Sequence, residues 1–326
     1  MHEAVLHGIA GAYEGEMREQ LATPWRLTVL PEEAGPAAVA AAFGRAHAVV
    51  LTRFDRSMPL GPEVRLVQVG GAGLDAVDLE AIPPRIAVCN AFGHEDGMAE
   101  YVLLSILAWR HRLLEMAAGF KAGSWRFSGH IGDPPHGEVA GATLGILGLG
   151  RIGRAVAVRA RALGLRVLAC NRSPVPEPPV DELLTWSRLD ELLPRVDFLV
   201  LTCALDPTTR GLIDARRLSL LRPEAVLVNV ARGPICVEAD LFEALRARRI
   251  GGAVLDVWWR YPSPRDPAPR PSALPFHELD NVIMTPHASG WTRGLFRRRG
   301  GQIARNLDAL ATGAPLINLV RAPMAA

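Results

Sequence analysis

The segment from Thr143 to Arg154, T-L-G-I-L-G-L-G-R-I-G-R, constrains the fold of this chain more than any other. An apolar run typical of a buried strand precedes Gly148, Gly150 and Gly153, and a helix-like pattern follows them. The first glycine permits a tight turn, the second lets a pyrophosphate approach the backbone, and the third lets the helix pack close to the strand. Because the N-terminus of the helix also attracts phosphate, the segment predicts a dinucleotide-binding turn. A purely structural glycine turn is the alternative.

Strand-like and helix-like segments alternate along the chain and predict two α/β blocks, each with a doubly wound parallel sheet. The first block contains five short apolar runs, at Ala4–Leu6, Arg26–Leu30, Ala48–Leu51, Arg65–Val69 and Ile86–Cys89. The second block predicts six strands, at Leu144–Leu147, Arg166–Cys170, Phe198–Cys203, Ala225–Val230, Ala253–Val257 and Val282–Met284. Six is the strand number of the doubly wound dinucleotide fold.

Three further segments predict local structure. A single helix is expected over 98–118; because it is apolar around most of its circumference, it should be buried between domains or against another subunit. A tail helix is expected over 293–310, with the Arg297–Arg299 cluster on a solvated face. The glycine turn at 70–73 follows a strand, so it is either a small anion-binding nest or a plain turn.

Composition excludes several classes of function. The net charge of +2 is too small to suggest a nucleic-acid binder, and no apolar stretch approaches the 18 residues of a membrane span. The N-terminus does not resemble a signal peptide. The four cysteines, Cys89, Cys170, Cys203 and Cys236, form no C-x-x-C motif, so we expect free thiols and no metal site. The chain is therefore expected to be cytoplasmic, without a nucleic-acid or membrane partner.

The end of the second strand in the dinucleotide block indicates the choice of cofactor. An acidic residue that would bind the ribose 2′-hydroxyl is expected there, but the chain has Asn171, Arg172 and Ser173 instead. Arg172 can pair with a 2′-phosphate and Ser173 can hydrogen-bond it. This pattern favours NADP(H) over NAD(H). In the alternative, Arg172 is a surface residue and NAD is held by Asn171 alone.

Two later strand ends carry side chains suited to chemistry. Arg232 follows a buried strand and precedes Gly233, at the edge where open α/β sheets bind ligands, so its planar guanidinium suits a carboxylate or carbonyl. His287 follows the last strand, and histidine is the usual acid or base near neutral pH. Strand-end capping by Arg232 and a structural role of His287 are the alternatives.

Together these motifs resemble the D-isomer-specific 2-hydroxyacid dehydrogenases, which include glyoxylate/hydroxypyruvate reductases, phosphoglycerate dehydrogenases and metal-free formate dehydrogenases. The resemblance covers nearly the whole chain. The matching segments are G-G-A-G-L-D-A-V-D-L at Gly70–Leu79, M-A-E-Y-V at Met98–Val102, G-L-G-R-I-G at Gly148–Gly153, V-N-V-A-R-G at Val228–Gly233, G-G-A-V-L-D-V at Gly251–Val257 and T-P-H at Thr285–His287.

The resemblance implies a dinucleotide-binding domain at 98–287, inserted into a flavodoxin-like substrate domain made of 1–97 and 288–326, with the active site in the cleft between them. It implies that Arg232 holds the substrate carboxylate and that His287 donates the proton. Backbone N–H groups of Gly71, Ala72 and Gly73 would bind the carboxylate, and a homodimer would form through the 98–118 helix. The implied cofactor contacts are Gly148, Gly150, Arg151, Ile152, Gly153, Asn171, Arg172, Ser173, Cys203, Val230, Ala231, Asp256, His287, Ser289 and Gly290, with Asp256 facing the nicotinamide carboxamide.

Two positions depart from the family pattern. Tyr261 stands where relatives usually have a glutamate that raises the pKa of the catalytic histidine. A neutral phenol cannot do this, so His287, oriented by Tyr261 or water, should be charged only at lower pH, and reduction should favour mildly acidic conditions. His94 stands where many relatives have asparagine, which would put it near the substrate. Alternatively, His94 and Glu95 are hinge residues, or Glu95 replaces the missing glutamate.

These observations predict an NADP(H)-preferring oxidoreductase, with NAD(H) possible, that acts on a small 2-oxo or 2-hydroxy acid of the D series. One alternative is a formate-type dehydrogenase, which needs no proton donor; the glutamine and asparagine of that subgroup are missing here. Another is a cofactor-sensing binding protein of the kind found among transcriptional corepressors that share this fold. The retained Arg232 and His287 argue against a pure binding protein.

Overall fold

The computed structural model describes residues 1–130, 135–263 and 266–324. The chain divides into two compact units. Unit 1 comprises Met1–His94 and Trp291–Ala326, and unit 2 comprises Glu95–Gly290. The boundaries expected at residues 97 and 287 each lie three residues from these divisions. Both units are α/β domains built on a parallel sheet, and the predicted fold class is confirmed.

Unit 1 contains a six-stranded sheet with the strand order β13-β5-β4-β3-β1-β2. Its parallel strands run in the flavodoxin-like order, 2-1-3-4-5. The strands are β1 (His2–His7), β2 (Trp25–Leu30), β3 (Ala48–Leu51), β4 (Leu66–Val69), β5 (Ala87–Cys89) and β13 (Leu319–Arg321). Strand β13 pairs antiparallel with β5 and was not predicted, because three partly exposed residues give no pattern.

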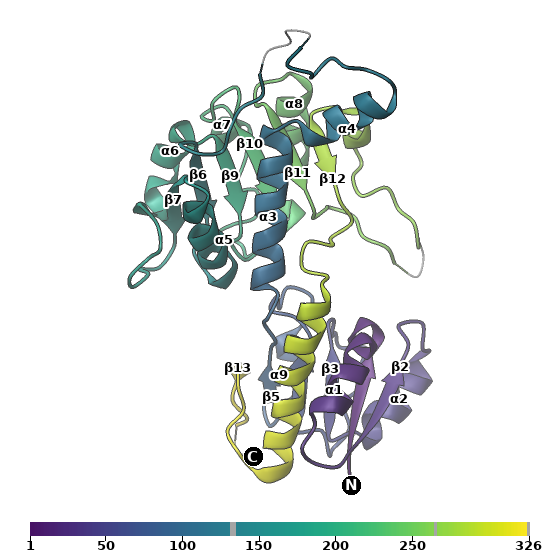
Figure 1. Ribbon diagram of the computed structural model, residues 1–326. Coiled ribbons are helices and arrows are strands. Elements are labelled where there is room, and N and C mark those ends of the chain that lie inside the picture. Colours follow the sequence, from purple (N-terminus) through teal and green to yellow (C-terminus); the bar gives the residue numbers. More distant parts are fainter. Residues whose placement is uncertain (131–134, 264–265, 325–326) are drawn as a thin grey trace. The chain divides into compact units, whose positions relative to one another are not determined.

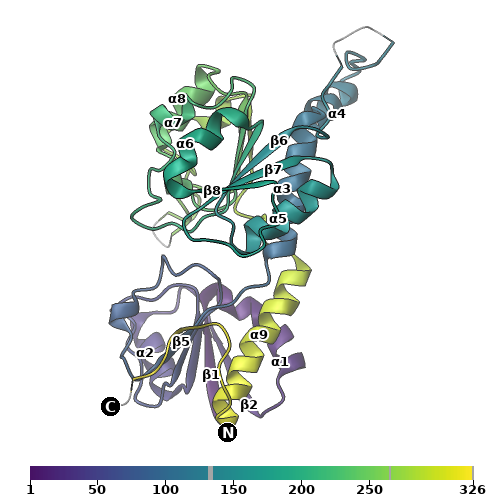
Figure 2. The same cartoon turned by 90° about the vertical axis from the view of Figure 1, so that its left-hand side faces the viewer.

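Helices cover both faces of the unit 1 sheet. Helices α1 (Glu14–Gln20) and α9 (Arg293–Thr312) lie side by side on one face, as Figure 2 shows, and α2 (Pro36–Arg45) covers the other. The segment before α1 is a 3-10 helix, Gly8–Tyr13. Alternate strand residues point to opposite faces: Val5 packs on the α2 side, and Leu6 packs on the α9 side. Another 3-10 turn spans Leu79–Ala81.

Unit 2 contains seven parallel strands with the order β12-β11-β10-β9-β6-β7-β8. The strands are β6 (Thr143–Leu147), β7 (Arg166–Asn171), β8 (Glu182–Thr185), β9 (Phe198–Leu201), β10 (Val226–Asn229), β11 (Gly252–Leu255) and β12 (Val282–Met284). This is the doubly wound 3-2-1-4-5-6 order with one more strand at the end. The predicted count of six was wrong, because β8 is a half-buried edge strand that follows a proline-rich segment.

The helices of unit 2 are α3 (Glu95–Arg110), α4 (Leu113–Lys121), α5 (Arg151–Ala162), α6 (Leu189–Leu192), α7 (Ala215–Leu218) and α8 (Glu238–Arg246). Helix α3 packs along α5 on one face of the sheet (Figure 1). The single helix expected over 98–118 was wrong. Arg112 adopts a left-handed conformation with φ 52°, which ends the first helix before α4 begins. Short 3-10 turns span Trp186–Arg188, Leu193–Arg195, Gly233–Ile235 and Phe276–Glu278.

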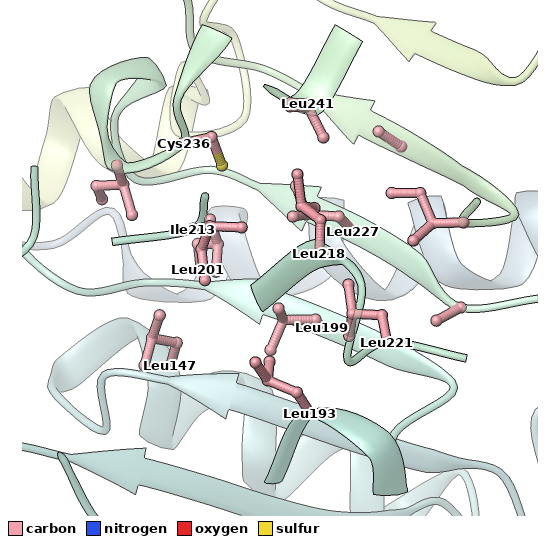
Figure 3. Close-up of a cluster of buried hydrophobic side chains, with 14 of the residues drawn as sticks. Leu147, Leu193, Leu199, Leu201, Ile213, Leu218, Leu221, Leu227, Cys236 and Leu241 are labelled. Atoms are coloured by element: carbon pink, nitrogen blue, oxygen red, sulfur yellow. The ribbon is translucent and has the colours of Figure 1, made fainter. Parts of the chain in front are cut away.

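The unit 2 sheet is buried on both faces. On one face, leucines of β6, β9 and β10 meet leucines of α7, α8 and the turn after α6 (Figure 3). On the other face, strand residues such as Ile146 and Val200 pack against α3 and α5. Each buried leucine contributes about 1.5–3 kcal/mol relative to an exposed one, so this core fixes the strand ends from which the site is built. In the part of the chain that the structure describes, no helix has the length and apolarity to cross a membrane.

Candidate active site

Six strands of unit 2 end in loops that carry residues singled out from the sequence. Because the strands are parallel, their carboxyl ends share one edge of the sheet, where doubly wound folds bind ligands. The loop residues, in the order of β6, β7, β9, β10, β11 and β12, include Gly148–Gly153, Asn171–Ser173, Cys203, Val230–Arg232, Asp256 and His287–Gly290.

The turn after β6 requires its glycines for identifiable reasons. Gly148 has φ 98°, and a Cβ there would lie 2.7 Å from the backbone N and Cα of Cys203. A Cβ on Gly153 would lie 2.3 Å from the carbonyl oxygen of Gly148. A Cβ on Gly150, the N-cap residue of α5, would meet only open space. The turn is thus tightly packed beneath and open above the helix N-terminus, where N–H groups attract phosphate.

The end of β7 supports this turn and carries the residues expected to select the cofactor. Asn171 accepts a hydrogen bond from the N–H of Leu149 at 2.9 Å and donates to the carbonyl oxygen of Ser173 at 2.7 Å. The guanidinium of Arg172 contacts the carboxylate of Asp206 at 2.7 Å. The Arg172 side chain is 63% exposed, so this ion pair contributes little to stability. Asn171 therefore holds the glycine turn, while Arg172 remains accessible at the surface.

A cavity of about 250 Å³ opens beside this turn. It is lined by Gly148, Gly150, Asn171, Arg172, Ser173, Trp186, Thr202, Cys203, Ala204, Asp206 and Thr209. Hydrogen bonds from Thr208, together with Arg172, lower the pKa of Asp206 to about 2, so its carboxylate is charged. Burial raises the pKa of Cys203 to about 12, so its thiol is neutral. These features fit the part of a dinucleotide that carries its phosphate groups: the glycine turn is open, a cavity lies beside it, and the guanidinium of Arg172 is accessible.

The loop after β10 fixes the backbone of Arg232. Asn229 is fully buried; its amide donates to the carbonyl oxygen of Arg232 at 3.0 Å and accepts from the N–H of Ala231 at 3.1 Å. The guanidinium of Arg232 donates to the carbonyl oxygen of Ala231 at 2.8 Å. A Cβ on Gly233 would lie 2.5 Å from backbone atoms of Trp258, so only glycine fits there. Asn229 therefore supports the end of β10 through its hydrogen bonds to the loop backbone.

The loop after β12 carries His287 in a left-handed conformation, with φ 60°. Such a conformation costs about 1–3 kcal/mol in a non-glycine residue and persists only where the surroundings enforce it. The fully buried Asp256 supplies that restraint. One of its oxygens accepts from the hydroxyl of Thr285 at 2.6 Å and the N–H of Ala288 at 2.8 Å, and the other accepts from the N–H of Ser289 at 2.8 Å.

Asp256 is therefore a loop anchor as well as a candidate contact to the nicotinamide. Its second oxygen accepts one bond from the described residues, which leaves a lone pair that can accept another. The hydroxyl of Tyr101 lies 2.5 Å from that of Thr285 and extends the network to α3. Because burial raises the pKa of Tyr101, its phenol stays protonated and can donate. Neither Tyr101 nor Thr285 was predicted, since their contact spans 184 residues.

Tyr261, at the position where the resemblance leads one to expect a glutamate, lies beside His287. The two ring centroids are 5.5 Å apart, with the ring planes tilted by 56°. The phenolic oxygen of Tyr261 accepts from the N–H of Trp258 at 3.1 Å, and the indole of Trp258 donates to the carbonyl oxygen of Thr285 at 2.8 Å. Tyr261 and Trp258 thus contact the loop that carries His287 and stabilise it from one side.

The other predicted substrate residues belong to unit 1. Gly71, Ala72 and Gly73 follow β4, and their N–H groups have no acceptor among the described residues. The carbonyl oxygen of Gly71 accepts from the N–H of Ala91, and that of Ala72 accepts from the side chain of Asn90. These two carbonyl groups are thus engaged in hydrogen bonds within the unit while the N–H groups remain available, which agrees with the interpretation of this turn as an anion nest.

His94 lies after β5, where it contacts α9. Its Nδ1 is 3.2 Å from a guanidinium nitrogen of Arg299. The prediction that Arg297–Arg299 form a solvated face was wrong for Arg299, which is half-buried and turned towards Tyr13 and His94. Three arginines in sequence gave no sign of this, because helical geometry places neighbouring residues on different faces.

Comparison with known proteins identifies what this arrangement is similar to. Residues 103–289 match the family model described as the NAD-binding domain of D-isomer-specific 2-hydroxyacid dehydrogenases. A glyoxylate reductase of Thermococcus gammatolerans is 35% identical over 258 residues, covering 77% of this chain and 75% of that protein. A glycerate dehydrogenase of Methylorubrum extorquens is 33% identical over 258 residues, covering 78% of each chain.

Solved structures agree with the sequence matches. The NADPH-dependent glyoxylate/hydroxypyruvate reductase of Sinorhizobium meliloti, in complex with NADP and sulfate, has a TM-score of 0.80 and 26% identity, with 98% of each chain covered. A 2-hydroxyacid dehydrogenase from Ketogulonicigenium vulgare has a TM-score of 0.81 and 28% identity, covering 99% of this chain and 100% of that one.

Proposed function

This chain belongs to the D-isomer-specific 2-hydroxyacid dehydrogenases, and we propose that within the family it is a reductase of small 2-oxo acids that prefers NADPH. The observation that carries the proposal is the strand-end set of unit 2, in which Arg232 and His287 are each fixed by a fully buried polar residue, Asn229 and Asp256. Because the loops that carry them are held in place, the cation and the acid/base group suit the reduction of a carbonyl that lies beside a carboxylate.

In the proposed reaction, the carbonyl carbon would be reduced by a hydride that a bound nicotinamide would supply. Arg232 binds the substrate carboxylate and polarises the carbonyl oxygen, and the N–H groups of Gly71–Gly73 also bind the carboxylate. His287, charged before the step, gives its proton to the carbonyl oxygen as negative charge develops there. Tyr261 lies beside the imidazole, where its ring can orient that of His287.

The preference for NADPH rests on charge at the end of β7. Arg172 is accessible beside the cavity, no carboxylate occupies the position of Asn171, and Ser173 adds a hydroxyl. Asp206 partly neutralises Arg172, and a 2′-phosphate must compete with it for the guanidinium. We therefore expect a moderate preference for NADPH, with NADH also accepted.

A substrate panel tests this proposal. Oxidation of NADPH and of NADH is followed separately with glyoxylate, hydroxypyruvate, pyruvate and longer 2-oxo acids. The proposal predicts turnover of at least one of these acids, with a higher kcat/KM for NADPH than for NADH. If both cofactors bind but no acid is reduced, the protein is a cofactor-sensing binding protein rather than a reductase.

A second candidate function is the oxidation of formate or a similar small anion by hydride transfer alone. The replacement of the usual glutamate by Tyr261 favours this candidate. That reaction needs no proton from His287, so the phenol beside the imidazole would not hinder it. Adding formate with NADP⁺ or NAD⁺ to the panel decides between the two. Formate oxidation without reduction of any 2-oxo acid would favour this second candidate.

We further propose that the protein acts as a homodimer that uses the surface of α3 and α4. Every residue of α4 is exposed or half-buried, and the exposed apolar side chains on and beside it are large. They are Leu104, Leu113, Leu114, Phe120 and Trp125. Phe120 and Trp125 contact each other with ring centroids 5.0 Å apart, and exposed apolar groups of this kind mark association surfaces. Light scattering should give twice the 35.2 kDa mass of one chain, and a monomer would contradict the proposal.

A further inference from the structure

We propose that Arg299 is an anion-binding residue of unit 1 and that it directs the enzyme towards 2-oxo acids carrying a second anionic group, a carboxylate or a phosphate. This inference rests on the reductase function proposed above and narrows its substrate class. Arg299 occupies a position where the helix should be apolar.

Arg299 lies on the core-facing side of α9. Leu295 is four residues before it and Ile303 is four residues after it, and both are buried. Residues four apart share one face of a helix, so Arg299 occupies the apolar stripe between them. The adjacent Arg297 and Arg298 are exposed. A charged side chain in such a stripe is costly unless it is paired or has a ligand.

The described partners of Arg299 include two side chains and no carboxylate, and its guanidinium also lies 5.9 Å from the centroid of the Tyr13 ring. One terminal nitrogen donates to the phenolic oxygen of Tyr13 at 2.9 Å, and the other lies 3.2 Å from Nδ1 of His94. Its Nε is buried and has no hydrogen-bond partner among the described residues. Within those residues, no carboxylate lies within ion-pair distance of Arg299. The unused Nε donor and the lack of a carboxylate within ion-pair distance fit a guanidinium that is completed by an anion.

The fold places this guanidinium next to the predicted anion nest of the same unit. Tyr13 ends the 3-10 helix that follows β1, and Gly70 follows β4, so both lie near the carboxyl edge of the sheet. A Cβ on Gly70 would be 3.2 Å from the ring of Tyr13, the residue whose hydroxyl contacts Arg299. Tyr13 therefore contacts both the guanidinium and Gly70, the residue directly before the Gly71–Gly73 turn, and the guanidinium and the N–H groups of that turn both attract negative charge.

A substrate with two anionic groups can bind both to the N–H groups of Gly71–Gly73 and to the guanidinium of Arg299. The carboxylate next to the carbonyl binds the N–H groups of Gly71–Gly73, and the second anionic group binds the planar fork of Arg299, which suits both carboxylate and phosphate. A 2-oxo acid with a single carboxylate, such as pyruvate, leaves Arg299 without an anion. Arg299 thus acts on specificity, and the hydride and proton steps do not involve it.

The test compares kcat/KM of the wild-type protein and an Arg299→Met variant on pyruvate, oxaloacetate and 3-phosphonooxypyruvate. We expect the variant to lose about tenfold or more on one or both dianionic acids, because a charge-assisted pair is removed, and to keep its activity on pyruvate. Oxaloacetate and the phosphorylated acid distinguish the two kinds of second anion. Arg297→Met, on the exposed side of the same helix, is the matched control and should change neither.

An equal loss on pyruvate and the dianions, or no loss at all, would overturn the inference. The Arg299→Lys variant keeps the positive charge and so controls for a folding defect. It should retain part of the preference for dianionic acids. An equal loss of kcat/KM on all three acids in this variant would count against a specificity role. Calorimetric titration of the cofactor-free enzyme with malonate, with acetate as reference, does not depend on turnover.

The two measurements separate the two proposals. If no 2-oxo acid is reduced but malonate binds and Arg299→Met abolishes its binding, the reductase proposal fails and the anion site stands. If 2-oxo acids are reduced but Arg299→Met changes neither the substrate preference nor malonate binding, the anion site fails and the reductase proposal stands.

Discussion

Replacing Arg172 with alanine should reduce the use of NADPH while leaving the use of NADH nearly unchanged. A hydrogen bond to a charged group contributes about 1.5–3 kcal/mol. Because the Arg172 side chain is 63% exposed and also contacts Asp206, we take the lower end of that range. About 1.4 kcal/mol corresponds to a factor of ten, so kcat/KM for NADPH should fall about tenfold.

Asp206 provides the complementary perturbation. Its carboxylate lies 2.7 Å from the Arg172 guanidinium and would repel a 2′-phosphate bound there. Two unit charges about 4 Å apart interact by about 1 kcal/mol in water-like surroundings. Asp206→Asn should therefore raise kcat/KM for NADPH about fivefold. The gain should be smaller in an Arg172→Ala background, because part of it comes from releasing that guanidinium.

Initial rates with NADPH and with NADH, at one saturating 2-oxo acid concentration, give both effects. Arg161→Ala is the matched control, since it removes an exposed arginine from an ion pair with Asp181 elsewhere in unit 2. The reasoning is refuted if Arg172→Ala changes the two cofactors by the same factor, or if Asp206→Asn lowers the use of NADPH.

Two further changes test the loop that carries His287. Tyr261→Glu places a carboxylate beside the imidazole and should raise the pKa of His287; the protonated form then persists to higher pH, so the fall of kcat/KM for reduction with rising pH should move to more alkaline values. A pH profile identical to that of wild type would contradict this account. In Asp256→Asn, the side-chain NH2 group would face a backbone N–H group of the loop, so one hydrogen bond would be lost. Urea denaturation should therefore show a free energy of unfolding lower by about 1.5–3 kcal/mol, and kcat should also fall. Unchanged stability and kcat would show that Asp256 does not hold the loop.

Local patterns in the sequence were enough to predict the core of unit 2. The strand, glycine turn and helix at 143–154 carry their signal within a dozen residues, and β6 and α5 lie where it indicates. The break at Arg112 had no such signal, because arginine rarely adopts a positive φ and the surrounding residues favour helix. Strand β8 was missed for a similar reason, since an edge strand is short and only partly apolar.

The partners of the site residues could not be predicted in the same way. The contacts between Arg172 and Asp206 and between Thr285 and Asp256 span 34 and 29 residues, and the fold alone brings them together. Asp256 was expected to face the nicotinamide; its role as a loop anchor follows from backbone N–H groups that carry no sequence information. Arg299 was misjudged because exposure along a run of arginines depends on helix rotation against the sheet.

Transfer of a labelled hydride tests the central claim most directly. The protein is incubated with NADPH that carries deuterium at both C4 positions and with the 2-oxo acid other than glyoxylate that it turns over best, and the product is analysed by mass spectrometry and on a chiral column. The account predicts a D-2-hydroxy acid with one deuterium at C2, formed far more slowly by a His287→Asn variant. An unlabelled product, an L-2-hydroxy acid, or equal rates for the two proteins would contradict it.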